Sequence, residues 1–233
     1  GVLLAVRASA TQGATVTTGT ISPDRGGWVR LKGPGRDLTL ASVYIPPTKG
    51  THDGVTRGLR VVEHLETWLA QCPKRTGLLV MGDFNCQVGP APHGPAPPVH
   101  PLTVGRANVA RESAVGKAVH AVCEARGLIV ANTHFQTGPT FVGSSGHSSR
   151  IDYCLVRRSQ WGQVRGMRRL TQVGWATQLH PGQDHYPIMV DLRVGRQWQE
   201  PRGAGADSWD PRLLSQLHQE EGAPLRQALA DIA

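Results

Sequence analysis

The stretch VMGDFN at residues 80–85 constrains this chain more than any other part of its sequence. The short apolar run before it, residues 78–81, is typical of a buried strand, and the Gly- and Pro-rich sequence after it cannot continue one. Asp83 and Asn85 are therefore predicted where a central strand opens into a loop. Residues two apart in an extended chain point the same way, so a carboxylate and an amide converge there. They could orient a water, a metal ion or a phosphoryl oxygen; the alternative is a local Asx turn.

A second stretch, SSRIDYCLV at residues 148–156, alternates as a strand with Asp152 in its middle. A carboxylate at such a position is costly to bury unless it is paired. One partner is Arg150, two residues away on the same face, and this pairing would make the carboxylate purely structural. The other reading is that Asp152 belongs to a site formed with residues from elsewhere in the chain.

The third stretch, DHYP at residues 184–187, stands at the entrance to a predicted strand, residues 188–192. His185 is of interest because histidine titrates near neutral pH and a carboxylate can hold its tautomer. Asp152 is a candidate for that carboxylate if the two strands are neighbours. Loop polarity is the simpler explanation for the adjacent Asp184 and His185.

The remaining hydrophobic pattern predicts a layered α/β domain. Helices are expected over residues 53–71, with an apolar stripe of Val55, Leu59, Val62, Leu65 and Leu69, and over about 109–126. Further strands are expected over residues 1–7, 28–31, 38–45 and 128–132. Residues 1–193 are predicted to form this domain, 194–210 a linker, and 211–233 a helical tail that could pack on a downstream domain.

Composition narrows the class of protein. A net charge of +8 and a pI near 9.9 favour a polyanionic partner such as nucleic acid, although a basic surface without a partner is the alternative. The four cysteines are far apart and form no C-x-x-C pair, so we expect reduced thiols in an intracellular protein and no zinc site. No apolar run of about 18 residues exists, so we expect no membrane span. The sequence does not begin with Met, which indicates a fragment.

A basic segment follows the second stretch. Between residues 150 and 169 the chain carries six arginines with Asp152 as the only acid: Arg150, Arg157, Arg158, Arg165, Arg168 and Arg169. Such a segment could track the phosphates of a nucleic acid. We take Arg150, Arg165, Arg168 and Arg169 as the candidate substrate-binding residues.

Taken together and in this order, the three stretches resemble the endonuclease/exonuclease/phosphatase superfamily. The segment SVYIPP at residues 42–47 narrows the resemblance, because Tyr44 at this position is similar to apurinic endonucleases and to the endonuclease domain of LINE-type (non-LTR) retrotransposons. The resemblance covers residues 1 to about 193. It implies a four-layer α/β sandwich, in which two facing mixed sheets are flanked by helices, here lacking its first strands.

The resemblance also implies a mechanism: phosphodiester hydrolysis that depends on Mg²⁺ or Mn²⁺. Asp184 would help to hold the metal, and Asp83 and Asn85 would orient the attacking water or steady the leaving oxygen. His185, held by Asp152, would bind the scissile phosphate or take a proton, and Tyr44 would contact the phosphate. Carboxylate oxygens suit a hard divalent cation, which offsets charge that develops on phosphorus.

One departure from the family pattern affects the expected activity. The family's Asn and its metal-binding Glu lie on two strands that would precede residue 1, and no residue within 1–30 replaces that Glu. We therefore expect a DNA endonuclease of retroelement type that could be inactive as given, located inside the cell and in the nucleus, with DNA as partner, no membrane contact, and a fused reverse transcriptase downstream. The alternatives are a catalytically dead, basic DNA-binding remnant and a phosphatase of the same fold acting on a small phosphoester.

Overall fold

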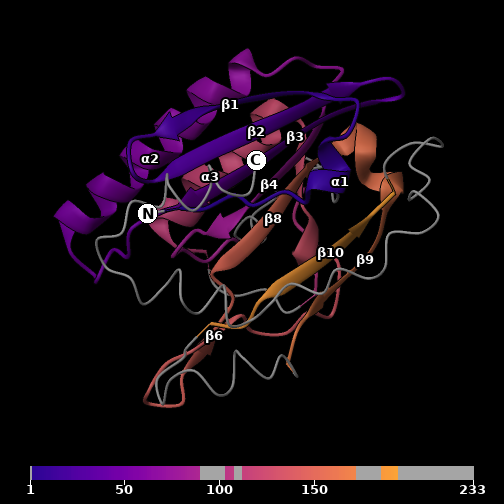
Figure 1. Cartoon of the computed structure of the whole chain (residues 1–233). Helices are drawn as coiled ribbons and strands as arrows, with labels where there is room; N and C mark the ends of the chain where they lie inside the picture. The colour runs from indigo at the N-terminus through magenta and orange to yellow at the C-terminus, as the bar shows by residue number, and fades with distance from the viewer. Residues whose placement is uncertain (1, 90–102, 108–111, 172–184, 194–233) are drawn as a thin grey trace, which may run out of the picture.

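A computed structural model describes residues 2–89, 103–107, 112–171 and 185–193, and a six-stranded mixed sheet runs through this part of the chain (Figure 1). The strands lie in the order β1-β2-β3-β4-β8-β5. β3 and β4 are parallel, whereas the other neighbouring pairs are antiparallel. The strand bounds are Thr15–Ser22 (β1), Gly26–Gly33 (β2), Arg36–Tyr44 (β3), Gly77–Asp83 (β4), Leu128–Val130 (β5) and Asp152–Arg157 (β8).

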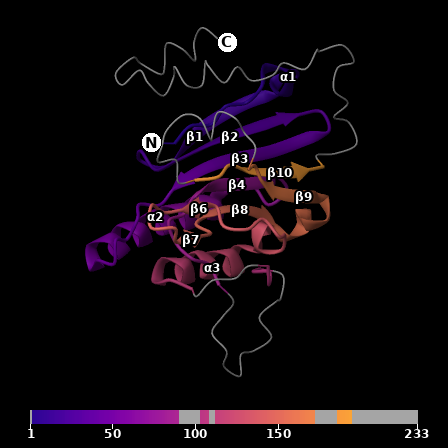
Figure 2. The same cartoon turned by 90° about the horizontal axis from the view of Figure 1, so that it is seen from below.

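Two long helices cover one face of this sheet. α2 (His52–Gln71) and α3 (Ala114–Arg126) pack against each other, as Figure 2 shows. Each begins at a hydroxyl residue whose side chain accepts a backbone N–H of the first turn, Thr51 for α2 and Ser113 for α3. α3 ends at Gly127, whose φ of 62° is the left-handed conformation that glycine adopts most readily.

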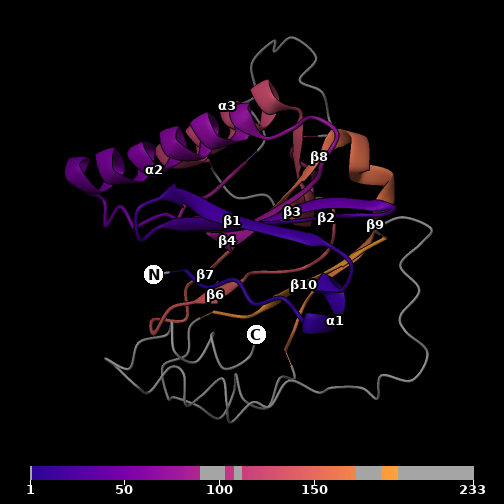
Figure 3. The same ribbon diagram turned by 45° about the horizontal axis from the view of Figure 1, so that its top comes forward.

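The opposite face of the main sheet is covered by a second, two-stranded sheet. Its strands are β9 (Val164–Arg169) and β10 (Ile188–Leu192), and Figure 3 shows them on the side away from α2 and α3, together with the four-residue helix α1 (Ala8–Thr11). The short strands β6 (Phe141–Val142) and β7 (Ser148–Ser149) form a separate hairpin, and 3₁₀ turns span Ala131–Thr133 and Arg158–Gln163.

The pleat of the main sheet assigns each side chain to one of two cores. In β4, Leu78 and Val80 point toward the helices, while Met81 packs on the core beneath the second sheet. In β8, Tyr153 and Leu155 belong to the helix-side core, and Cys154 belongs to the other. Side chains of the same parity as Met81 and Cys154 therefore face the second sheet.

The predicted α/β fold with two facing sheets and flanking helices is confirmed, and several element predictions are corrected. The predicted strand over residues 1–7 is wrong for residues 2–7, which pair with no described strand. The helix predicted from about residue 109 begins only at Ala114, after its Ser113 cap. The strand predicted over residues 148–156 is interrupted: β7 ends at Ser149 and β8 begins at Asp152.

The predicted apolar stripe of α2 is partly wrong. Leu59 is 40% exposed, whereas Val61 and Trp68, outside the predicted stripe, are buried. The helix is rotated toward Trp68 because that large ring packs on Trp28 of β2, with ring centroids 6.4 Å apart. Among the described residues, no helix combines the length and the apolar character that crossing a membrane requires. The predicted linker and helical tail, residues 194–233, lie outside the described residues.

A close approach of backbones at Gly82 holds the end of β4 against β3. A Cβ atom at Gly82 would lie 1.8 Å from the carbonyl oxygen of Val43, so no larger residue fits without moving one strand. Glycine at this position therefore permits the pairing that aligns Tyr44 with Asp83.

We predict that Gly82→Ala lowers the free energy of unfolding by about 3 kcal/mol or prevents folding, because overpacking against backbone cannot be relieved by a side-chain rotation. Urea unfolding followed by circular dichroism measures the loss. The matched control is Gly162→Ala, where an added Cβ meets nothing within 4 Å. Equal stability of the two variants would contradict the close approach at Gly82.

Candidate active site

The site is built on two carboxylates that face each other across neighbouring strands. Asp83, the last residue of β4, is the register partner of Asp152, the first residue of β8. Asp83 has the parity of Met81 and Asp152 that of Cys154, so both side chains point toward the second sheet. Strand pairing alone thus brings together two residues that are 69 positions apart in the chain (152 − 83).

His185 completes this cluster from the other sheet. It lies three residues before β10, and its Nδ1 is 3.0 and 3.2 Å from the two carboxylate oxygens of Asp152. The imidazole ring also packs edge-on against Phe141, with ring centroids 5.1 Å apart. Because a carboxylate only accepts, the contact places the proton on Nδ1 and directs Nε2 away from Asp152.

Asn85 binds Asp83 through a local turn. Its backbone N–H and its Nδ2 donate to the two carboxylate oxygens of Asp83 at 2.9 and 2.7 Å, and Nδ2 also donates to Ile45 O at 3.0 Å. Asn85 takes a φ of 43°, which asparagine tolerates better than most residues. The Asx turn that competed with the site reading is therefore present, and it also orients the Asp83 carboxylate toward the cluster.

Tyr44 lies on the other side of Asp83 from Asp152. It ends β3, and its Cα is in parallel register with that of Asp83. Its neighbours Val43 and Ile45 are buried in the helix-side core, so the Tyr44 ring is on the same face as the two carboxylates. The structure thus brings Tyr44, Asp83, Asn85, Asp152 and His185 to one end of the main sheet. Their catalytic roles remain predictions.

Burial raises the pKa of Asp83 from its ordinary value near 3.8 to about 6. The negative charge of Asp152 adds to this effect, while the hydrogen bonds from Asn85 and the nearby His185 oppose it. Asp83 is therefore an acid that changes protonation close to neutral pH. Such a group can exchange a proton with a reacting oxygen.

Two buried polar residues that sequence reasoning missed hold the backbone of Asp152. Asn132, fully buried just beyond the end of β5, donates from Nδ2 to Asp152 O at 2.9 Å and accepts from Cys154 N–H at 3.3 Å. The hydroxyl oxygen of Thr140, also fully buried, accepts from the N–H groups of Ile151 and Asp152 at 3.2 and 3.1 Å. A polar residue directly after the apolar run of residues 128–131 was the only signal for Asn132 in the sequence.

Thr140 also connects the two sheets. Its carbonyl oxygen accepts the backbone N–H of Tyr186, the residue after His185, at 2.7 Å. One threonine therefore contacts the peptide of Asp152 and the chain that carries His185. This double contact sets the separation of the Asp152–His185 pair.

The predicted arginine segment does not form one surface. Arg150 is only 5% exposed and donates to the carbonyl oxygens of Gly138 and Ala107, so it does not pair with Asp152 and its position favours a structural role. Burial lowers its pKa. Arg157 donates to Thr76 O and Pro73 O, and Arg158 lies 3.7 Å from Glu124.

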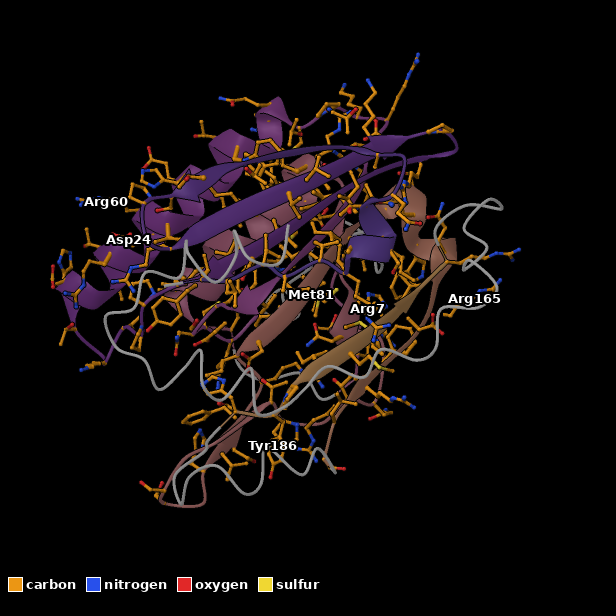
Figure 4. All side chains as sticks on the ribbon, in the orientation of Figure 1. Arg7, Asp24, Arg60, Met81, Arg165 and Tyr186 are labelled. Carbon is orange, nitrogen blue, oxygen red and sulfur yellow. The ribbon has the colours of Figure 1, made fainter. Side chains whose placement is uncertain are left out.

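The three arginines of β9 differ in position. Arg165 lies at the end of β9 away from Tyr186 (Figure 4), and Arg168 is exposed on the same strand. Arg169 lies at the site end: its guanidinium is 4.4 Å from the Tyr186 ring centroid, and Nη1 donates to Pro139 O at 2.7 Å. Substrate binding by these arginines, and by Arg150, stays a prediction.

The cluster is suited to a divalent cation. Asp83, Asp152 and His185 each offer a donor atom, and these atoms all lie within 4.8 Å of one another. A cation there would offset the negative charges of the two carboxylates, and carboxylate oxygens are the ligands that Mg²⁺ and Mn²⁺ prefer. Asp184, the predicted metal ligand, lies outside the described residues. The identity of the ion is therefore left to the proposal below.

Comparisons with solved structures identify the fold. The endonuclease domain of TRAS1, a telomere-specific non-LTR retrotransposon, superposes with a TM-score of 0.50 at 17% identity, covering 77% of this chain and 68% of that domain. An AP endonuclease from Archaeoglobus fulgidus gives 0.51 at 21% identity over 77% and 70% of the chains. The 3′-5′ exonuclease NExo from Neisseria meningitidis gives 0.50 at 16% identity over 76% and 70%.

The chain has the endonuclease/exonuclease/phosphatase fold. This confirms the fold that the three sequence stretches predicted. In sequence, the chain is 28% identical over 171 residues to craniofacial development protein 2 from Bos taurus, which covers 71% of this chain. The chain spans about a quarter (26%) of that relative's length. No protein-family model matches the sequence.

Asp83 should make stability depend on pH in a direction opposite to that of ordinary carboxylates. Its folded-state pKa, about 6, lies above its ordinary value, so between about pH 4 and 6 the folded state holds a proton that the unfolded state has released. Stability from this group is present at low pH and lost as the pH rises through that window. We predict that Asp83→Asn becomes more stable relative to the wild type as the pH increases from about 4 to 7, measured by urea unfolding in metal-free buffer.

Asp37→Asn provides a control of opposite sign. The hydrogen bond from Arg30 lowers the pKa of Asp37, so its contribution is present above the ordinary carboxyl pKa and lost as the pH falls through the lower, folded-state value. This variant should lose stability relative to the wild type at neutral pH. If both variants follow the same trend, the assigned environment of Asp83 is wrong.

We predict that Asn132→Ala lowers the free energy of unfolding by about 2 to 6 kcal/mol, because two buried backbone groups lose their partners at about 1 to 3 kcal/mol each. Chemical denaturation measures this loss. Gln163→Ala truncates an amide at an exposed position and should change stability by less than about 0.5 kcal/mol. A small effect at both positions would show that Asn132 does not hold the Asp152 backbone.

Proposed function

We propose that this chain hydrolyses phosphodiester bonds of DNA with the help of a divalent cation, Mg²⁺ or Mn²⁺. The observation that carries the proposal is the convergence of Asp83, Asp152 and His185 at one end of the main sheet, with Nδ1 of His185 3.0 Å from Asp152. The nucleases with the same fold support this class of reaction. The net charge of +8 supports a polyanionic substrate.

The residues of the site are proposed to have separate roles in the reaction. Asp83 and Asn85 orient the water whose oxygen attacks phosphorus, and a carboxylate oxygen of Asp83 accepts the proton that this water loses. Asp152 aligns His185 so that its Nε2 faces the phosphate. When the imidazole ring is protonated, it stabilises the negative charge that develops on the leaving oxygen as the bond from that oxygen to phosphorus breaks. Tyr44 contacts the same phosphate from the far side of Asp83.

The metal ion would be held by Asp83 and Asp152, together with the predicted ligand Asp184. When bound, it supplies a positive charge that stabilises the phosphorane-like transition state. By family resemblance, an upstream Glu would add a further ligand. We extend the proposal to an endonuclease of retroelement type that acts on nuclear DNA, and the TRAS1 likeness and the sequence motifs support this extension.

We predict that the chain, tested as given and with any preceding residues of its reading frame added, nicks supercoiled plasmid in Mg²⁺ and that chelation stops the reaction. Asp83→Ala, Asp184→Ala and His185→Ala should each lower the rate by at least about 100-fold, the scale typical of general acid–base and electrostatic groups. Asp152→Asn should lose activity without losing its fold. Gel electrophoresis of the plasmid forms gives the rate.

His147→Ala is the matched control, because His147 is exposed in the loop between β6 and β7. It should nick at the wild-type rate. Equal nicking by every variant would identify a contaminating nuclease. DNA binding without cleavage in both forms of the chain would support the catalytically dead DNA-binding alternative instead.

A further inference from the structure

Arg25 is a second candidate contact for substrate, and sequence reasoning did not select it. It lies in the turn between β1 and β2, and its backbone oxygen accepts the N–H of Tyr44 at 2.7 Å. Its guanidinium carbon is 5.1 Å from the centroid of the Tyr44 ring. Within the described ranges, no hydrogen bond or ion pair joins this guanidinium to another side chain, although it is half-buried.

Arg25 lies on the far side of Tyr44 from the two carboxylates, Asp83 and Asp152. Tyr44, Asp83 and Asp152 end or begin three consecutive strands, so Arg25 lies beyond Tyr44 on the side of Asp83 that is remote from Asp152. Neighbouring strands are about 4.8 Å apart, so Tyr44 and Asp152 are separated by about 10 Å. A phosphate bound beyond Tyr44 is therefore a different one from that at the carboxylates, since successive phosphates of a strand are at least about 3.4 Å apart.

A second arginine–tyrosine stack adjoins His185 in the chain. Arg169 covers the ring of Tyr186, which follows His185, and it uses Nη1 for one hydrogen bond to Pro139 O. A guanidinium carries five N–H donors, so a hydrogen bond from one nitrogen leaves donors for a further acceptor. Two arginine–tyrosine stacks therefore adjoin the site, one through Tyr44 and one through Tyr186, the residue after His185.

We propose that Arg25, held against the Tyr44 ring, binds a phosphate of a polynucleotide strand other than the phosphate at the Asp83–Asp152–His185 cluster. Stacking on an aromatic ring restricts the guanidinium and leaves its donor edge for phosphate oxygens. The inference rests on the proposed function and makes it more specific. A second phosphate contact beyond Tyr44, in addition to the cluster, favours a continuous strand over a mononucleotide.

The test measures the binding of a fluorescein-labelled DNA duplex in EDTA, by anisotropy, between about 50 and 200 mM NaCl. Arg25→Gln should weaken binding about tenfold, the effect of one lost charge-assisted hydrogen bond. It should also reduce the slope of log affinity against log salt by about 0.9, the value for one phosphate contact. Arg25→Lys should keep the slope and recover part of the affinity, because it keeps the charge without the planar stack.

Arg75→Gln is the matched control, with the same loss of charge at an exposed position just before β4, at the opposite end of that strand from Asp83. Competition by a mononucleotide should be the same for the wild type and Arg25→Gln. If Arg25→Gln and Arg75→Gln give the same affinity and slope while the wild type binds and nicks DNA, the role of Arg25 is refuted and the proposed function stands. Absence of any DNA binding by the wild type overturns both. If Arg25→Gln does not fold, a Lys variant that loses the wild-type slope overturns the inference.

Discussion

The pairing of β4 with β8 is the constraint on which the rest of this structure depends. It places Asp83 directly opposite Asp152, on the face that the second sheet covers. Two partly buried carboxylates at this separation repel each other unless a positive charge or hydrogen-bond donors lie close by. The surrounding residues supply both: Asn85 donates twice to Asp83, and His185 contacts Asp152. The site geometry follows from this compensation.

The same arrangement separates residues that act from residues that position them. Asn132 extends the hydrogen bonding of β8 past the end of β5, and Thr140 joins the peptide of Asp152 to that of Tyr186. Neither side chain is exposed, so neither can touch a substrate. Their contribution is to keep Asp152, in the main sheet, and His185, in the segment before β10, at hydrogen-bonding distance. The raised pKa of Asp83 shows that burial at the site carries a cost in stability at neutral pH.

The arginines that are clustered in the sequence do not form one basic surface in the structure. The arginines between residues 150 and 169 looked continuous in sequence, yet Arg150 is buried and Arg157 binds backbone carbonyls far from Asp152 in the chain. Arg25, isolated in sequence, lies instead beside Tyr44. Charge density along a chain therefore predicted a polyanionic partner without locating where that partner would bind, because strand pairing decides which arginines share a surface.

Local sequence was sufficient for β2, β3, β4, β5, β8, β10 and the two long helices, and for the residues that meet at the site, but it did not predict β1 or β9. The apolar run before Asp83, the alternation around Asp152 and the position of His185 before a strand each depend on neighbours in the chain, and short-range periodicity records them. Tertiary structure alone decided the rotation of α2 toward Trp68, the absence of a strand at residues 2–7, and the roles of Asn132 and Thr140. These features depend on which strands become neighbours and which backbone groups need partners, and both are contacts between residues distant in sequence. The sequence by itself thus determined which catalytic side chains are available at the end of β4. The packing of the two sheets decided which buried side chains hold them in position.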